Sequence, residues 1–77
     1  MEPYQTNDLY IAALFLALGE KLMSTITDKG KVFWVFVPSS RIPELEIEWA
    51  NNSIQVPAKG YAEALRTLKA HTFRGKP

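Results

Sequence analysis

The longest apolar stretch of the chain runs without interruption from Leu9 to Leu18. A helix at a protein surface carries one apolar stripe, whereas this stretch has no polar side at all. Alanine and leucine favour a helix, and the stretch is long for a strand, so it predicts a helix that is covered from more than one direction. We expect Thr6 to cap its start, with Asp8 in the first turn, and Gly19 to end it in a left-handed conformation.

Two strands are predicted next. Alternation in Leu22–Thr27 places Leu22, Ser24 and Ile26 on one face, and the turn residues 28–30 lead into a second strand, Val32–Val37. Both faces of this second strand are apolar, which is typical of a strand that is covered on both sides. A hairpin alone is marginal in water, so the strand needs another neighbour. That neighbour is either a short third strand at Ile54–Val56 or the same hairpin of a second chain.

Residues 39–51 fit two patterns. Alternation in residues 44–49 favours a strand, whereas the spacing of Ile42, Leu45 and Trp49 favours a short amphipathic helix. We favour the helix because serines precede it, Pro43 suits a first turn, and two asparagines follow it. Pro57 then opens a last helix. Its apolar stripe consists of Tyr61, Ala62, Leu65 and Leu68, and residues 74–77 form a frayed tail.

These elements predict one α+β domain spanning residues 1–77, in the order helix, β-hairpin, short helix and long C-terminal helix, with the helices packed as one small layer on the hairpin. A chain of 77 residues buries only about 60% of its unfolded surface, so its stability needs support. Cysteine is absent, which excludes disulfides and thiolate metal sites. A partner chain is the remaining source of support.

The residue pattern also resembles a small bacterial and phage-associated domain family of unknown function. The resemblance covers nearly the whole chain and is most specific in the opening, where Tyr4, Thr6, Asp8-Leu9-Tyr10 and Ala12-Ala13 follow one another at the family's spacing. Other shared features are Asn51-Asn52 ahead of Val56-Pro57-Ala58, and the closing Ala64-Leu65 and Leu68-Lys69. It implies the same α+β order with a helix at residues 40–51, and it implies no activity, substrate or catalytic residue.

No catalytic, cofactor or metal site is expected, and no small-molecule substrate is indicated. The four glycines are scattered, so they form no phosphate-binding loop. The single histidine, His71, suits the last turn of a helix better than general-base catalysis. Glu44, Glu46 and Glu48 lack the spacing of a calcium loop. No signal peptide or membrane span is recognisable, so we expect a cytoplasmic protein that does not enter a membrane.

Two kinds of partner remain. The surplus of apolar surface favours protein–protein interaction, beginning with a homodimer formed by hairpin pairing or by a strip of small residues, Ala13 and Ala17. Trp34 and Phe36 complete the candidate interface, although Trp34 and Trp49 are better explained as core residues. The alternative is nucleic-acid binding by the basic residues Lys29, Lys31, Arg66, Lys69 and Arg74. The net charge of only +1 makes a solvated polar face the preferred explanation of these cations.

Overall fold

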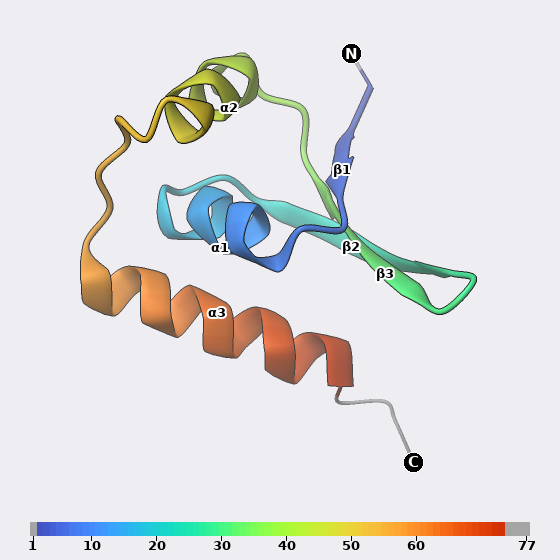
Figure 1. Cartoon of the computed structure of the whole chain (residues 1–77). Coiled ribbons are helices and arrows are strands. Elements are labelled where there is room, and N and C mark those ends of the chain that lie inside the picture. The colour runs from blue at the N-terminus through green and yellow to red at the C-terminus, as the bar shows by residue number, and fades with distance from the viewer. Residues whose placement is uncertain (1, 74–77) are drawn as a thin grey trace.

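The computed structural model of the protein describes the backbone of residues 2–73 and the side chains of residues 2–70. The described chain contains three strands and three helices, in the order β1 (Tyr4–Thr6), α1 (Leu9–Ala17), β2 (Leu22–Asp28), β3 (Lys31–Phe36), α2 (Arg41–Ala50) and α3 (Ala58–Phe73) (Figure 1). The expected α+β order is confirmed, with one strand added at its start. The expected frayed tail, residues 74–77, lies outside the described residues.

The sheet is antiparallel with the strand order β1-β3-β2. Its third strand is Tyr4–Thr6, which pairs with β3 so that Tyr4 lies opposite Phe36 and Thr6 opposite Trp34. The expectation of a third strand at Ile54–Val56 is therefore wrong. Those residues form part of the connection between α2 and α3.

The hairpin of β2 and β3 turns as the sequence predicts. Lys29 and Gly30 both have positive φ angles, 52° and 82°, as in the type I′ turns that match the twist of the flanking strands. A β-bulge between Leu22 and Ser24 shifts the register of β2. Leu22 therefore pairs with Phe36, and Ser24 pairs with Val35. We expected Leu22 and Ser24 to lie on the same face of the sheet, but the bulge places them on opposite faces.

The first helix is capped at both ends. The Asp8 carboxylate accepts hydrogen bonds from the backbone N–H groups of Tyr10, at 2.9 Å, and Ile11, at 3.3 Å. Asp8 is thus the N-cap in place of Thr6, which belongs to β1 and whose hydroxyl accepts from the Asp8 N–H at 3.1 Å. Gly19 has a φ of 96°, and the Glu20 N–H donates to the Phe15 carbonyl at 2.9 Å, so the predicted left-handed end of the helix is confirmed.

The second and third helices are also where the start and stop signals place them. Residues 41–50 are helical and bury Ile42 and Leu45, so the helix is confirmed over the strand. Asn52 ends this helix with a φ of 56°. The last helix starts at Ala58, one residue later than expected, because Pro57 supplies the carbonyl that accepts from the Tyr61 N–H at 2.9 Å.

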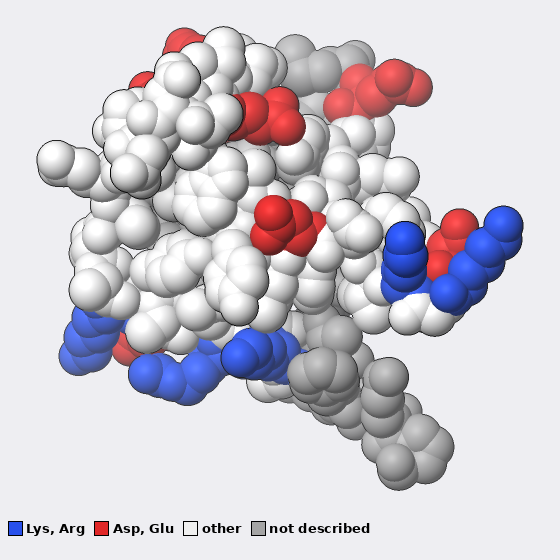
Figure 2. Space-filling model, in the orientation of Figure 1, with Lys and Arg blue, Asp and Glu red and all other residues white. Residues whose placement is uncertain are grey.

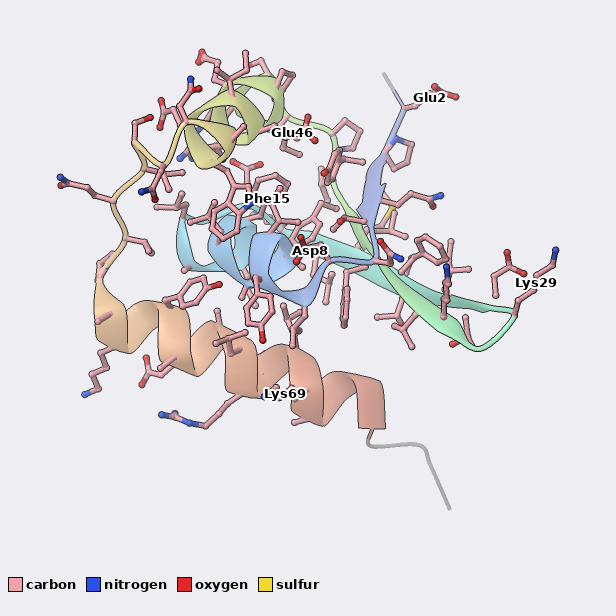
Figure 3. All side chains as sticks on the ribbon, in the orientation of Figure 1. Glu2, Asp8, Phe15, Lys29, Glu46 and Lys69 are labelled. Carbon is pink, nitrogen blue, oxygen red and sulfur yellow. The ribbon has the colours of Figure 1, made fainter. Side chains whose placement is uncertain are left out.

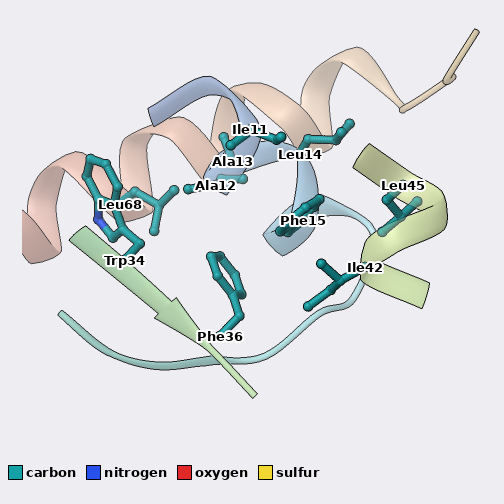
Figure 4. Close-up of a cluster of buried hydrophobic side chains, with 11 residues drawn as sticks. Ile11, Ala12, Ala13, Leu14, Phe15, Trp34, Phe36, Ile42, Leu45 and Leu68 are labelled. Carbon is teal, nitrogen blue, oxygen red and sulfur yellow. The ribbon is translucent and has the colours of Figure 1, made fainter. Parts of the chain in front are cut away.

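The core lies between one face of the sheet and the helices, with α1 at its centre (Figure 4). Phe15 of α1 makes edge-to-face contacts with Phe36, at 5.6 Å between ring centroids, and with Tyr4, at 5.3 Å. All three helices contribute buried residues to this cluster together with Trp34 and Phe36 of β3. The helices therefore cover one face of the sheet, as the sequence predicts, and the apolar first helix is covered by the sheet, α2 and α3. No helix in the described part of the chain is long and apolar enough to cross a bilayer.

Candidate interaction surfaces

The residues predicted as a dimer interface lie inside the single chain. Ala13 and Phe36 are fully buried, Trp34 is nearly so, and Ala17 is half-buried against the same cluster. Ala12 and Ala13 lie on the side of α1 that faces Leu68 of α3 (Figure 4). The small side chains do allow another element to approach closely, but that element is α3 of the same chain. Ala13, Trp34 and Phe36 therefore offer no surface to a second folded copy.

The sheet has a second face that no helix covers. Side chains alternate along a strand, so Phe33 and Val35 point away from the face that holds Trp34 and Phe36. Val37 and Ile26 extend the same face, and 45% of the Ile26 surface is exposed. We call Ile26, Phe33, Val35 and Val37 the open sheet face. It confirms that β3 has two apolar faces. The helices cover only the face of Trp34 and Phe36; on the other face Val35 is only 5% exposed, Phe33 is half-buried, and Ile26 and Val37 are exposed.

A second apolar surface lies on the helical side of the molecule. A groove of about 330 Å³ separates α2 from α3, and its lining consists of Leu14, Trp49, Asn52, Ile54, Val56 and Tyr61. Trp49 remains 36% exposed and Tyr10 59% exposed. The expectation that Trp49 is a core residue is therefore wrong, whereas the same expectation for Trp34 is confirmed.

Two tyrosine hydroxyls form hydrogen bonds between elements that lie far apart in the sequence. The Tyr61 hydroxyl of α3 donates to the Tyr10 carbonyl of α1 at 3.0 Å. The Tyr4 hydroxyl of β1 donates to a Glu46 carboxylate oxygen of α2 at 2.8 Å. Partial burial, followed by the neighbouring Glu46 carboxylate, raises the Tyr4 pKa to about 12. Tyr4 therefore joins the edge strand of the sheet to α2.

Acidic and basic side chains are divided between two helices. The second helix carries Glu44, Glu46 and Glu48, and α3 carries Lys59, Arg66 and Lys69 with one acid, Glu63. The three acids of α2 do not share one side of the helix. Glu46 accepts the Tyr4 hydroxyl, whereas Glu44 and Glu48, one turn apart, line a separate hollow together with Leu18, Arg41 and Gln55. Figure 2 shows the cations along the α3 side of the molecule.

The candidate nucleic-acid contacts fall into two groups. Lys29 and Lys31 lie at the tip of the hairpin beside Asp28, and Arg66 and Lys69 lie on α3. These groups occupy separate parts of the surface in Figure 2, with Lys29 and Lys69 labelled in Figure 3. Arg74 lies outside the described residues. The four candidate contacts within the described residues therefore form two separate pairs rather than one continuous basic surface.

The described side chains contain no group of three or more histidine, cysteine or acidic residues placed to hold a metal ion. The resemblance of the opening residues to a bacterial and phage-associated family stays a prediction. No protein-family model matches the chain, and neither a curated protein nor a solved structure is significantly similar to it.

Proposed function

We propose that the protein is a protein–protein interaction module that self-associates as a homodimer. The observation that carries the proposal is that five of the six exposed large apolar side chains of the described residues lie on two surfaces. Met23, Ile26 and Val37 belong to or border the open sheet face, and Tyr10 and Trp49 lie at or beside the groove, whereas Ile47 is exposed on α2. Exposed apolar residues that are scattered singly are ordinary, whereas gathered ones mark interaction sites.

Chain length supports the proposal. A domain of 77 residues has a small core, and the described part of this chain contains neither a disulfide nor a metal cluster to supplement it. Burying apolar surface contributes about 25 cal/mol for each square ångström removed from water. A second copy that covers one of the two surfaces therefore stabilises the fold as well as the assembly.

Sedimentation equilibrium over a range of concentrations tests the proposal. We expect the mean mass to rise from 8.7 kDa towards twice that value between about 1 and about 100 µM, because modest interfaces have dissociation constants in this range. The midpoint of thermal unfolding should rise over the same concentrations, since dimerisation stabilises the folded state by mass action. A protein that stays at the monomer mass at about 100 µM would not be a homodimer in the sense proposed.

A further inference from the structure

We infer that the two copies associate through the outer edge of β2, which pairs antiparallel with β2 of the second copy and joins the two three-stranded sheets into one. This inference rests on the proposed homodimer and adds its interface. It is drawn from the position of β2 in the sheet, from the lack of protection along its outer edge and from the pattern of its side chains.

The first step is the position of β2 at the edge of the sheet. In the order β1-β3-β2, only one side of β2 is paired with a neighbouring strand. Every second residue of an edge strand directs its backbone N–H and C=O groups away from the sheet, and these groups can pair with a further strand. The turn end of the β2–β3 hairpin lies beyond the three helices, so a second strand can approach it (Figure 1). The chemistry of this edge therefore fits an extended chain segment.

The second step is a comparison of the two edges of the sheet. Edge strands of natural proteins are kept from pairing by short length, by proline or by charged side chains. The other edge, β1, has only three residues and follows Pro3, which has no N–H group to donate. The edge strand β2 has seven residues, contains no proline and carries no charge before Asp28 at its end. Two of its apolar side chains, Met23 and Ile26, are exposed, so β2 is the edge that is open to pairing.

The third step concerns the side chains that a second copy would bring. Antiparallel pairing about a two-fold axis normal to the sheet keeps the two sheet faces aligned, so opposite residues lie on the same face. With Ile26 on the axis, the two Ile26 side chains meet on the open sheet face, and Thr25 lies opposite Thr27 of the second copy on the covered face. Opposed threonines stabilise antiparallel strands, and the Ile26 pair removes exposed apolar surface from water. The segment Thr25-Ile26-Thr27 therefore matches its own reverse.

The neighbouring registers are less favourable. An axis at Thr27 would place Ile26 opposite the Asp28 carboxylate of the other copy, and an axis at Thr25 would place it opposite Ser24. With the axis at Ile26, Asp28 lies opposite Ser24, and no like charges meet within residues 24–28. The bulge that precedes Ser24 ends regular pairing on that side. The side chains of β2 thus favour a second copy of β2 in one register.

Opposite charges introduced at Ile26 provide the test. Ile26→Lys and Ile26→Glu each set two like charges against each other beside the axis, so the dissociation constant of either variant alone should rise about 10-fold or more. An equimolar mixture sets a lysine against a glutamate, so a heterodimer should form although each variant alone is impaired. Sedimentation with one variant carrying a fluorophore distinguishes this heterodimer from residual homodimers.

A matched control introduces the same charges at the other edge of the same face. Gln5 of β1 pairs with Val35 and is exposed, so its side chain shares the open sheet face with Ile26 but lies two strands away. Dimerisation of Gln5→Lys and Gln5→Glu should be unchanged. Circular dichroism of all four variants establishes that the fold is retained, so loss of the dimer is separated from loss of structure.

Single cysteines determine the register. The chain contains no cysteine, so an introduced thiol can form a disulfide only with the second copy. In the inferred register the two Ile26→Cys positions face each other at about 4.5–5.5 Å between Cα atoms, within the range of a disulfide. Two Thr25→Cys positions, or two Thr27→Cys positions, are diagonal at about 7–8 Å. Mild oxidation should therefore give a covalent dimer with Ile26→Cys and little with Thr25→Cys, Thr27→Cys or Gln5→Cys.

The outcomes separate the interface from the dimer itself. A wild-type monomer at about 100 µM overturns both the homodimer and this interface. A wild-type dimer that both charged Ile26 variants retain overturns the interface only, as does a mixture of the two that fails to associate. Backbone amides of β2 that exchange equally fast in monomer and dimer also overturn it, because packing of sheet faces would leave them unpaired. Dissociation of each variant, recovery on mixing and cross-linking specific to Ile26→Cys support the inference.

Discussion

The two faces of the sheet differ in what covers them rather than in their chemistry. On strand β3, Trp34 and Phe36 lie under the helices, whereas Phe33 and Val35 lie on the open sheet face one residue away. The first pair contains two aromatic residues and the second pair contains one, so both faces of the strand are strongly apolar. Alternation of apolar and polar residues identifies the buried face of a strand when the other face is polar. In β3 both faces are apolar, so alternation does not show which face the helices cover. The covered face is the one on which residues from all three helices meet, and β3 alone does not encode that choice.

The largest expected effect comes from shortening a phenylalanine on each face. Phe36→Ala removes a fully buried ring and should lower the free energy of unfolding by about 3–5 kcal/mol. Phe33→Ala removes a half-buried ring on the open sheet face and should cost about 1 kcal/mol. Urea unfolding at a concentration where the protein is monomeric measures both. Equal losses would contradict the comparison, because they would mean that the two rings are covered to the same extent.

A smaller effect is expected from adding a charge on each face of β2. Thr25 pairs with Trp34 and is half-buried, so Thr25→Lys should destabilise the fold by about 1–3 kcal/mol. Ile26→Lys at the next residue should change stability by less than about 0.5 kcal/mol. Chemical unfolding at a concentration where the protein is monomeric tests the pair. A loss of stability from Ile26→Lys as large as that from Thr25→Lys would contradict the comparison.

The smallest effect concerns the tyrosine at the edge of the covered face. Folding raises the Tyr4 pKa from 10.0 to about 12, mainly through burial and then through Glu46. The folded state therefore favours the neutral phenol, and the stabilisation is complete below pH 10 and is lost as the pH rises from 10 towards 12. Glu46→Gln should lower this pKa, and Glu44→Gln should not.

Near-ultraviolet absorbance of the tyrosinate group follows this titration, and a Tyr4→Phe variant identifies the contribution of Tyr4. The Tyr61 pKa is also raised by burial, so the difference spectrum between Tyr4→Phe and the parent is needed. An unchanged midpoint in Glu46→Gln would show that the hydrogen bond between β1 and α2 does not persist in solution.

Local signals in the sequence predicted most of the elements. The uninterrupted apolar run predicted a covered helix that ends at Gly19, and the turn at residues 28–30 predicted the hairpin. Serines marked the start of α2, and a proline marked the start of α3. The strand β1 was missed because it has only three residues and pairs with β3, whose residues lie far along the chain. The alternation of Tyr4 and Thr6 was the available signal, and it is too short to distinguish a strand from the approach to a helix.

The surfaces were harder to predict than the elements. The two apolar faces of β3 are evident in the sequence, but Phe36 was named as a candidate interface residue although it belongs to the core. Trp34 was also named as a candidate, but the core was its preferred explanation, and that explanation is confirmed. Trp49 was assigned to the core although it lines the groove at the surface. The position of α2 relative to α3 decides the exposure of Trp49, and it depends on the path of residues 51–57 rather than on any local pattern.

The position of β1 at the edge of the sheet sets the order in which the sheet is completed. Thr6 pairs with Trp34, which is synthesised 28 residues later, whereas the two strands of the hairpin are joined by a two-residue turn. Closing the short loop is entropically cheaper, so we expect the hairpin to form before β1 docks. During that interval β3 is itself an edge strand with apolar side chains on both faces. We therefore expect aggregation through this exposed strand to compete with folding, to an extent set by the rate at which β1 docks on β3.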